Sequence, residues 1–258
     1  MSPAGLETWP AEAWENNTVF HVREGAESVS DSARAWWRGD LEDVDLVRKH
    51  RWGGRVERNA DYFFKRFSIR SLRYLHKPLR GRRTLAQEQA IESAGLRVPR
   101  SVGLIERRRC GLVVESAVIS EALDGVESVF ELFNGSPLAM EDKREWIKAF
   151  AEEVARFHRA GLFHGDLNLN NVLYRSHDRH FFWLDNEEGR NFDRIPEKYR
   201  LHDLNHINRY RHNLSLTDRL RLWRTYIEAA ELTPSESESF LPKIIHQSQA
   251  YWRKRQWL

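Results

Sequence analysis

The most unusual stretch of the sequence is a polar run, residues 164–171 (HGDLNLNN), with one histidine, one aspartate and three asparagines. Apolar residues flank it, with Phe163 before it and Val172 and Leu173 after it. Polar clusters of this composition usually form surface loops. Because both flanks are apolar, the sequence predicts a loop that is held against a hydrophobic core.

Side chains in and after this loop suit phosphoryl transfer. That reaction needs a carboxylate near the attacking hydroxyl, hard oxygen ligands for Mg²⁺ and a cation on the nucleotide phosphates. Asp166 lies in the loop, Asn171 follows five residues later, and Asp185 ends the apolar run 181–185 (FFWLD). If residues 171–175 and 181–185 form a hairpin, Asp185 returns towards Asn171.

Lys65 is the predicted cation. It lies within the alternating run 61–67 (DYFFKRF), an odd place for a lysine unless its ammonium reaches a partner, and Glu88 on the next predicted helix could be that partner. Simpler interpretations exist for each residue. Asp166 and Asn171 could cap a turn, Lys65 could face water from an edge strand, and Glu88 could be a solvated helix residue. The combination of groups favours the phosphotransferase hypothesis.

Hydrophobic periodicity divides the chain into a strand-rich part and a helix-rich part. The predicted strands lie at 44–47, 61–67, 97–105, 110–123, 171–175 and 181–185. The stretch 77–95 is predicted to begin as a basic loop and continue as a helix that ends at Gly95. Further helices are predicted at 140–161 and in three segments from residue 196 onward, the last with Ser235 as N-cap. The layout predicts an α+β, bilobal fold with a cleft between the lobes. We expect an unassigned N-terminal extension over 1–40, a strand-rich N-lobe over 41–124 and a mainly helical C-lobe over 125–258.

Composition narrows the class of protein. The chain has 258 residues, and its net charge of +3 is small for a dedicated nucleic-acid binder. A single cysteine, Cys110, excludes an intramolecular disulfide and a cysteine-rich metal site, which fits a reducing cytoplasm. The N-terminus does not resemble a signal peptide, and no run of about 18 apolar residues occurs. We therefore expect a cytoplasmic protein.

Basic residues cluster at 77–83 (KPLRGRR), 107–109 and 251–257 (YWRKRQW). Such runs usually form solvated faces. In the last cluster, Trp252 and Trp257 beside basic residues would also suit an anionic lipid surface, so peripheral contact with the inner membrane is an alternative. Nucleic acid has no supporting motif, and the histidines lack a spacing typical of zinc ligands.

The polar run and its surroundings resemble the protein-kinase-like superfamily, in which His-x-Asp precedes an asparagine five positions after the aspartate. The glycine after the histidine is similar to the small-molecule and sugar kinases of that superfamily. In more detail, the segments YFFKRF, GLRVPRS, FHRAGLFHGDLNLNNVLY and WLD resemble the lipopolysaccharide-core kinases, the Kdo/heptose kinase family. The resemblance covers about residues 44–210.

The resemblance implies a role for each candidate residue. Asp166 would be the catalytic base or orienting carboxylate for the acceptor hydroxyl. Asn171 and Asp185 would hold Mg²⁺. Lys65 would contact the α- and β-phosphates of ATP and pair with Glu88.

Four further positions would hold the nucleotide. Backbone groups of Glu121 and Leu123 would contact the adenine edge. Gly53 and Gly54, in RWGGR, would form the loop over the phosphates, although a plain hairpin turn has the same sequence pattern.

Two residues would support the catalytic loop. His164 would pack to shape it, and Asp203 would anchor it by accepting its backbone amides, unless Asp203 is an ordinary helix-cap or salt-bridge residue. The sequence departs from the protein kinases after Asp185, where Asn186 and Glu187 replace Phe-Gly. This removes the usual regulatory switch and disfavours a signalling kinase.

The expected function is an ATP- and Mg²⁺-dependent kinase that phosphorylates a heptose or Kdo hydroxyl of the lipopolysaccharide inner core. Its partner would be a lipid-linked core oligosaccharide. The alternatives are a kinase of the same fold that acts on protein or another small molecule, and a non-catalytic kinase-like module that binds partners or membrane.

Overall fold

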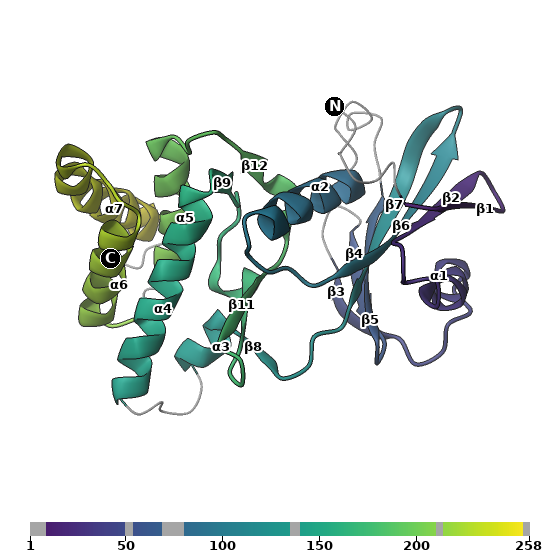
Figure 1. Ribbon diagram of the computed structural model, residues 1–258, viewed down its shortest axis with the longest axis horizontal. Coiled ribbons are helices and arrows are strands. Elements are labelled where there is room, and N and C mark those ends of the chain that lie inside the picture. Colours follow the sequence, from purple (N-terminus) through teal and green to yellow (C-terminus); the bar gives the residue numbers. More distant parts are fainter. Residues whose placement is uncertain (1–8, 50–53, 69–79, 135–139, 210–213, 255–258) are drawn as a thin grey trace. The chain divides into compact units, whose positions relative to one another are not determined.

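The structure is a computed structural model that describes residues 9–49, 54–68, 80–134, 140–209 and 214–254 (Figure 1). The chain forms two compact units. Unit 1 comprises Met1–Gln89 and Pro99–Asp124, and unit 2 comprises Ala90–Val98 and Gly125–Leu258. Unit 1 is rich in strands and unit 2 in helices, so the predicted α+β class is confirmed.

A seven-stranded antiparallel sheet with the order β1-β2-β6-β7-β5-β4-β3 forms the frame of unit 1. Its elements are β1 (Ala11–Trp14), β2 (Thr18–Val22), α1 (Val29–Arg38), β3 (Asp45–Lys49), β4 (Arg55–Arg58), β5 (Tyr62–Ser68), α2 (Arg80–Ser93), β6 (Ser101–Arg109) and β7 (Leu112–Glu121). Residues 9–40, which received no assignment from the sequence, form β1, β2 and α1, and β2 pairs with β6.

Strand β5 sends alternate side chains to two differently covered faces of the sheet. Phe64 is fully buried and stacks on Trp36 of α1, with 4.7 Å between ring centroids. Phe67 packs in a separate cluster with Leu85 of α2. Lys65 shares the face of Phe67, and its Nζ lies 5.4 Å from the centroid of that ring. The predicted alternation is therefore confirmed, and Lys65 lies on the sheet face that α2 covers.

Unit 2 has a largely helical core. Its elements are β8 (Val126–Ser128), α3 (Val129–Asn134), α4 (Met140–Arg159), β9 (Leu162–Phe163), β10 (Val172–Arg175), β11 (His180–Trp183), β12 (Arg190–Asn191), α5 (Glu197–Asn208), α6 (Leu216–Ala229) and α7 (Pro234–Lys254). The apolar positions of α4 at spacings of three and four, among them Ile147, Phe150 and Val154, are buried in this core. The amphipathic helix and the β10–β11 hairpin are both confirmed.

Two predicted boundaries were wrong. The strand expected over 97–105 begins only at Ser101, because Pro99 has no amide hydrogen for the sheet. The N-cap expected at Ser235 lies at Thr233, whose hydroxyl accepts from the amide of Glu236 at 3.2 Å. The carboxylate of Glu236 accepts from the amide of Thr233 in return, at 2.9 Å, which completes a capping box.

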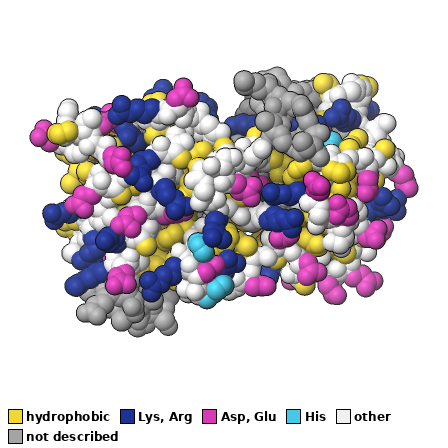
Figure 2. Space-filling model, in the orientation of Figure 1, with side chains coloured by type: hydrophobic (Ala, Val, Ile, Leu, Met, Phe, Trp, Pro, Cys, Tyr) yellow, Lys and Arg dark blue, Asp and Glu magenta, His cyan; other side chains and the backbone are white. Residues whose placement is uncertain are grey.

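The surface mixes charges of both signs. Figure 2 shows basic and acidic side chains interspersed over the face in view, which agrees with the small net charge of +3. None of the described helices combines the length and the apolar character that crossing a bilayer requires.

Candidate active site

The polar run leaves β9, passes through a turn and a short 3₁₀ helix (Leu169–Asn171), and enters β10. Leu167 and Leu169, which alternate with the polar residues, are fully buried in the unit 2 core. They fix the backbone, while the side chain of Asp166 remains half exposed. The predicted loop against a core is therefore confirmed.

His164 and Gly165 set the shape of this loop. The buried imidazole of His164 donates from Nε2 to the carbonyl of Leu184 at 2.8 Å and accepts at Nδ1 from the amide of Asp166 at 3.3 Å. Gly165 has a φ of +87°, and a Cβ there would lie 2.9 Å from the carbonyl oxygen of Glu188. Only glycine fits this position without strain, which explains why arginine does not follow the histidine.

Asp203 anchors the loop from α5, as predicted. Its carboxylate accepts from the amides of His164 at 2.9 Å and Gly165 at 3.0 Å. His158 contacts the same carboxylate at 3.3 Å through Nε2, and its Nδ1 lies 2.8 Å from the hydroxyl of Tyr226. Burial by itself raises the pKa of Asp203, but hydrogen bonds from histidines outweigh it and hold that pKa below its usual range.

We expect Asp203→Ala to lower the free energy of unfolding by about 2–5 kcal/mol, because two buried amides and a histidine lose their acceptor. Asp203→Asn keeps one oxygen and should lose less. Chemical denaturation followed by circular dichroism measures both, with exposed Asp193→Asn as the matched control. Equal stability of Asp203→Ala and the control would contradict the anchoring role.

Asn171 and Asp185 are brought together through the backbone. The Asn171 carbonyl accepts from the amide of Leu184, the residue before Asp185, at 2.9 Å. Its side-chain Nδ2 donates to the Asp166 carbonyl at 2.9 Å and lies 3.4 Å from Oδ2 of that residue. The loop and the end of the hairpin therefore form one local constellation.

The donor set suits a hard cation. Both side-chain hydrogen bonds of Asn171 use Nδ2, so its amide oxygen has no hydrogen-bond partner among the described residues. Asp185 would add a carboxylate at the end of the hairpin. Mg²⁺ typically takes one or two protein oxygens and completes its shell with water and substrate phosphates. The described residues contain no group of three or more His, Cys, Asp and Glu side chains placed for a metal. A Mg²⁺ site built from one or two protein oxygens does not require such a group.

His206 is a site residue that the sequence interpretation missed. Its Nδ1 lies 3.1 Å from Oδ1 of Asp166, and this hydrogen bond lowers the pKa of Asp166 to about 2. Burial lowers the pKa of His206 itself, so a neutral imidazole donates to the carboxylate at neutral pH. Asp203 and His206 are three residues apart on α5, and this spacing on one helix face was the available signal.

The predicted nucleotide contacts all belong to unit 1. Lys65 lies on β5, and the carboxylate of Glu88 on α2 is buried and accepts a hydrogen bond of 2.5 Å from Ser101. The Lys65–Glu88 pair itself stays a prediction. Gly54 immediately precedes β4, and Gly53 lies outside the described residues.

The adenine contacts also stay predictions. The amide of Glu121, at the end of β7, donates to the carbonyl of Arg100 at 2.9 Å. Because this amide already has a partner, the backbone group of Glu121 that could contact adenine is its carbonyl oxygen. Leu123 lies two residues further on, in the segment between β7 and β8.

A strand-rich unit with a helix on its sheet and a helical unit that presents an aspartate–asparagine loop define a protein-kinase-like fold. A solved structure titled "WaaP in complex with acyl carrier protein" shares this fold, with a TM-score of 0.67 and 20% identity, over 90% of this chain and 98% of that one. The model of the lipopolysaccharide kinase (Kdo/WaaP) family matches residues 23–226, and the chain belongs to that family. Membership of a kinase family implies the use of ATP.

Curated relatives carry the name 3-deoxy-D-manno-octulosonic acid kinase. One from Xylella fastidiosa (strain M12) is 29% identical over 153 residues, which are 58% of this chain and 56% of the relative. One from Xanthomonas axonopodis pv. citri (strain 306) is 34% identical over 119 residues, 44% and 43% of the two chains. One from Stenotrophomonas maltophilia (strain K279a) is 33% identical over 103 residues, 39% and 38%. The chain thus matches little more than half of these relatives at most.

Proposed function

We propose that this protein transfers the γ-phosphate of ATP to a sugar hydroxyl, of Kdo or heptose, in the lipopolysaccharide inner core. The observation that supports this most directly is the loop geometry. Asp166 is half exposed, held by Asn171 and His206, and mounted on a backbone that Asp203 anchors. Such an arrangement is preorganised to orient an attacking hydroxyl.

Each residue has a defined task in this proposal. Asp166 hydrogen-bonds the acceptor hydroxyl and takes its proton as the new O–P bond forms. Asn171 and Asp185 hold Mg²⁺, which neutralises charge on the phosphates. Lys65, paired with Glu88, binds the α- and β-phosphates.

Backbone contacts in unit 1 would complete the nucleotide-binding site. Gly53 and Gly54 cover the phosphates, and Glu121 and Leu123 hold the adenine edge. The acceptor would be lipid-linked core oligosaccharide at the inner face of the inner membrane, where the basic C-terminal segment contacts anionic lipid. Arg253 and Lys254 of that segment are exposed.

Incubation with labelled ATP and a panel of acceptors tests the proposal. We expect phosphate on lipopolysaccharide core oligosaccharide and none on protein, with the modified hydroxyl located by mass spectrometry. Labelled protein, or a labelled sugar outside the core, would support a kinase of the same fold with another substrate. The absence of both transfer and a nucleotide-dependent thermal shift would leave the non-catalytic module as the better account.

A further inference from the structure

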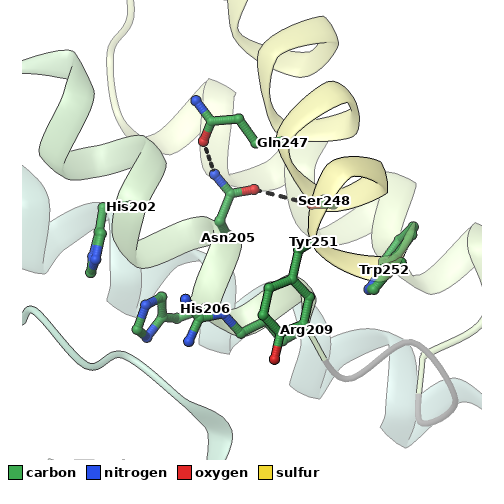
Figure 3. Close-up of a pocket in the computed structure, with 8 residues that line it drawn as sticks. All are labelled: His202, Asn205, His206, Arg209, Gln247, Ser248, Tyr251 and Trp252. Atoms are coloured by element: carbon green, nitrogen blue, oxygen red, sulfur yellow. Dashed lines mark hydrogen bonds between the residues drawn. The ribbon is translucent and has the colours of Figure 1, made fainter. Parts of the chain in front are cut away.

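A pocket lies between α5 and α7, within unit 2 (Figure 3). Its volume is about 220 Å³, below the range of about 300–1,000 Å³ that is typical for drug-sized ligands. His206 lines the pocket from α5, and Arg209 lines it from the position directly after α5. Tyr251 and Trp252 line it from α7. The size suits a single sugar unit rather than an oligosaccharide.

A polar network joins the two helices that line the pocket, with Asn205 on α5 and Gln247 and Ser248 on α7. Asn205 donates to the side chain of Gln247, and the Ser248 hydroxyl donates to Oδ1 of Asn205 at 3.0 Å, as Figure 3 shows. Nδ2 of Asn208 donates to the same hydroxyl at 2.6 Å. These bonds tie α5 to α7 along one wall of the pocket.

Arg209 places a positive charge in the pocket. Its guanidinium lies 4.8 Å from the ring centroid of Tyr251, and within the described part of the chain no carboxylate pairs with it. Arg200, on α5, by contrast donates to Glu236 at 2.9 Å. None of the eight described lining residues is acidic. An arginine beside an aromatic ring and without a carboxylate is a ready partner for an anionic ligand group.

His206 connects this pocket to the candidate catalytic carboxylate. The same imidazole that lines the pocket contacts Oδ1 of Asp166 at 3.1 Å. A ligand in the pocket would therefore lie one imidazole away from the group that orients the acceptor hydroxyl.

We propose that the α5–α7 pocket is the acceptor subsite, which binds one sugar unit bearing a carboxylate or phosphate, with Arg209 on the anionic group and Tyr251 against the ring. The anionic end occupies the pocket, and the reacting hydroxyl reaches Asp166 past His206. This assignment rests on the proposed function. Within that function it assigns a place in unit 2 to the acidic acceptor sugar and names a residue, Arg209, that determines specificity.

Binding of free 3-deoxy-D-manno-octulosonic acid, measured by calorimetry without nucleotide, tests the subsite. We expect Arg209→Gln to weaken binding about tenfold or more, because a charge-assisted contact is lost, and Arg209→Lys to recover part of it. Wild-type protein should bind the carboxyl-reduced sugar as weakly as Arg209→Gln binds the acid. Arg224→Gln, which changes an exposed arginine on α6, is the matched control and should bind normally.

Three results would overturn the subsite: no binding by wild-type protein, equal affinity of Arg209→Gln, or inorganic phosphate binding as tightly as the sugar acid. Thermal denaturation of each variant confirms that it is folded. Because binding is measured without nucleotide, its outcome is separate from transfer. Tight, Arg209-dependent binding without any phosphorylation would refute the proposed function and leave the pocket as a sugar-acid binding site rather than an acceptor subsite. Phosphorylation that is indifferent to Arg209 would refute the subsite alone.

Discussion

Asp166→Asn is expected to reduce phosphate transfer by about 10²–10⁴-fold, because the ionised carboxylate that orients the acceptor hydroxyl is lost. The protein should remain folded, because the Asp166 side chain is half exposed and fills no core space. The shorter of the two contacts from Asn171 goes to the backbone carbonyl of Asp166, which the substitution keeps. An asparagine oxygen can still accept from His206, so the variant removes charge and basicity more than shape.

The pKa of Asp166 constrains how this carboxylate works. The hydrogen bond from His206 lowers that pKa to about 2, so the carboxylate stays ionised as the pH falls until well below 4. The wild-type rate should therefore show no loss between pH 9 and pH 5 that arises from protonation of Asp166. A group of such low basicity accepts a proton poorly before the O–P bond forms, so its main contribution is to orient the hydroxyl.

Initial rates with saturating ATP and core acceptor, from pH 5 to pH 9, test the loss of transfer in Asp166→Asn. The same rates test whether the wild-type protein lacks an acid limb that arises from Asp166. Asp193→Asn, an exposed aspartate in the same unit, is the control for loss of one negative charge. Wild-type turnover by Asp166→Asn would remove the mechanism. An acid limb near pH 6 that disappears in that variant would show that the carboxylate titrates far above the expected value.

Local sequence patterns were enough to predict many of the helices and strands. The alternation around Lys65 and the three-and-four spacing in α4 are each a property of a single element. In both, the apolar side chains of the pattern lie in a buried cluster. The role of residues 9–40 depends instead on pairing at long range, since Thr18 of β2 lies opposite Arg107 of β6. No local signal specifies a partner almost ninety residues away, so this segment could not be assigned.

The same distinction applies to the site. Asp166 and Asn171 lie in one loop, and a hairpin brings Asp185 to it, so spacing alone located them. Arg209, directly after α5, meets Tyr251 of α7. Trp252, considered as part of a membrane anchor, lines the same pocket, and the guanidinium of Arg219 lies 5.0 Å from its ring centroid. Trp257 lies outside the described residues. Contacts of this kind depend on helix packing, which the sequence does not display.

The backbone at Asp185 is strained, and the proposed metal role gives a reason for that strain. Asp185 has a φ of +56°, in the left-handed region that costs a non-glycine residue about 1–2 kcal/mol, although aspartate and asparagine tolerate it best. Strain of this kind tends to persist where a side chain must be aimed for a purpose. A metal ligand at the end of β11 is such a purpose.

Asp185→Asn is therefore expected to lower transfer by about 10²–10³-fold, equivalent to several kcal/mol of lost charge stabilisation, with little change in melting temperature. The apparent affinity for Mg²⁺, from the dependence of rate on metal concentration, should weaken, and excess Mg²⁺ should recover part of the rate. Asp185→Ala loses the same carboxylate but tolerates the left-handed backbone poorly, so it should be both inactive and less stable. Asp185→Gly keeps the backbone freedom and should be inactive yet stable.

This series separates the ligand from the backbone. If Asp185 served only to make the turn, glycine and asparagine would both support wild-type transfer, and alanine alone would be impaired. If it is the metal ligand, all three variants lose transfer, and only alanine loses stability as well. An unchanged dependence of the rate on Mg²⁺ in Asp185→Asn would show that Asp185 is not a metal ligand. Asn171 would then lack its predicted partner in the metal site.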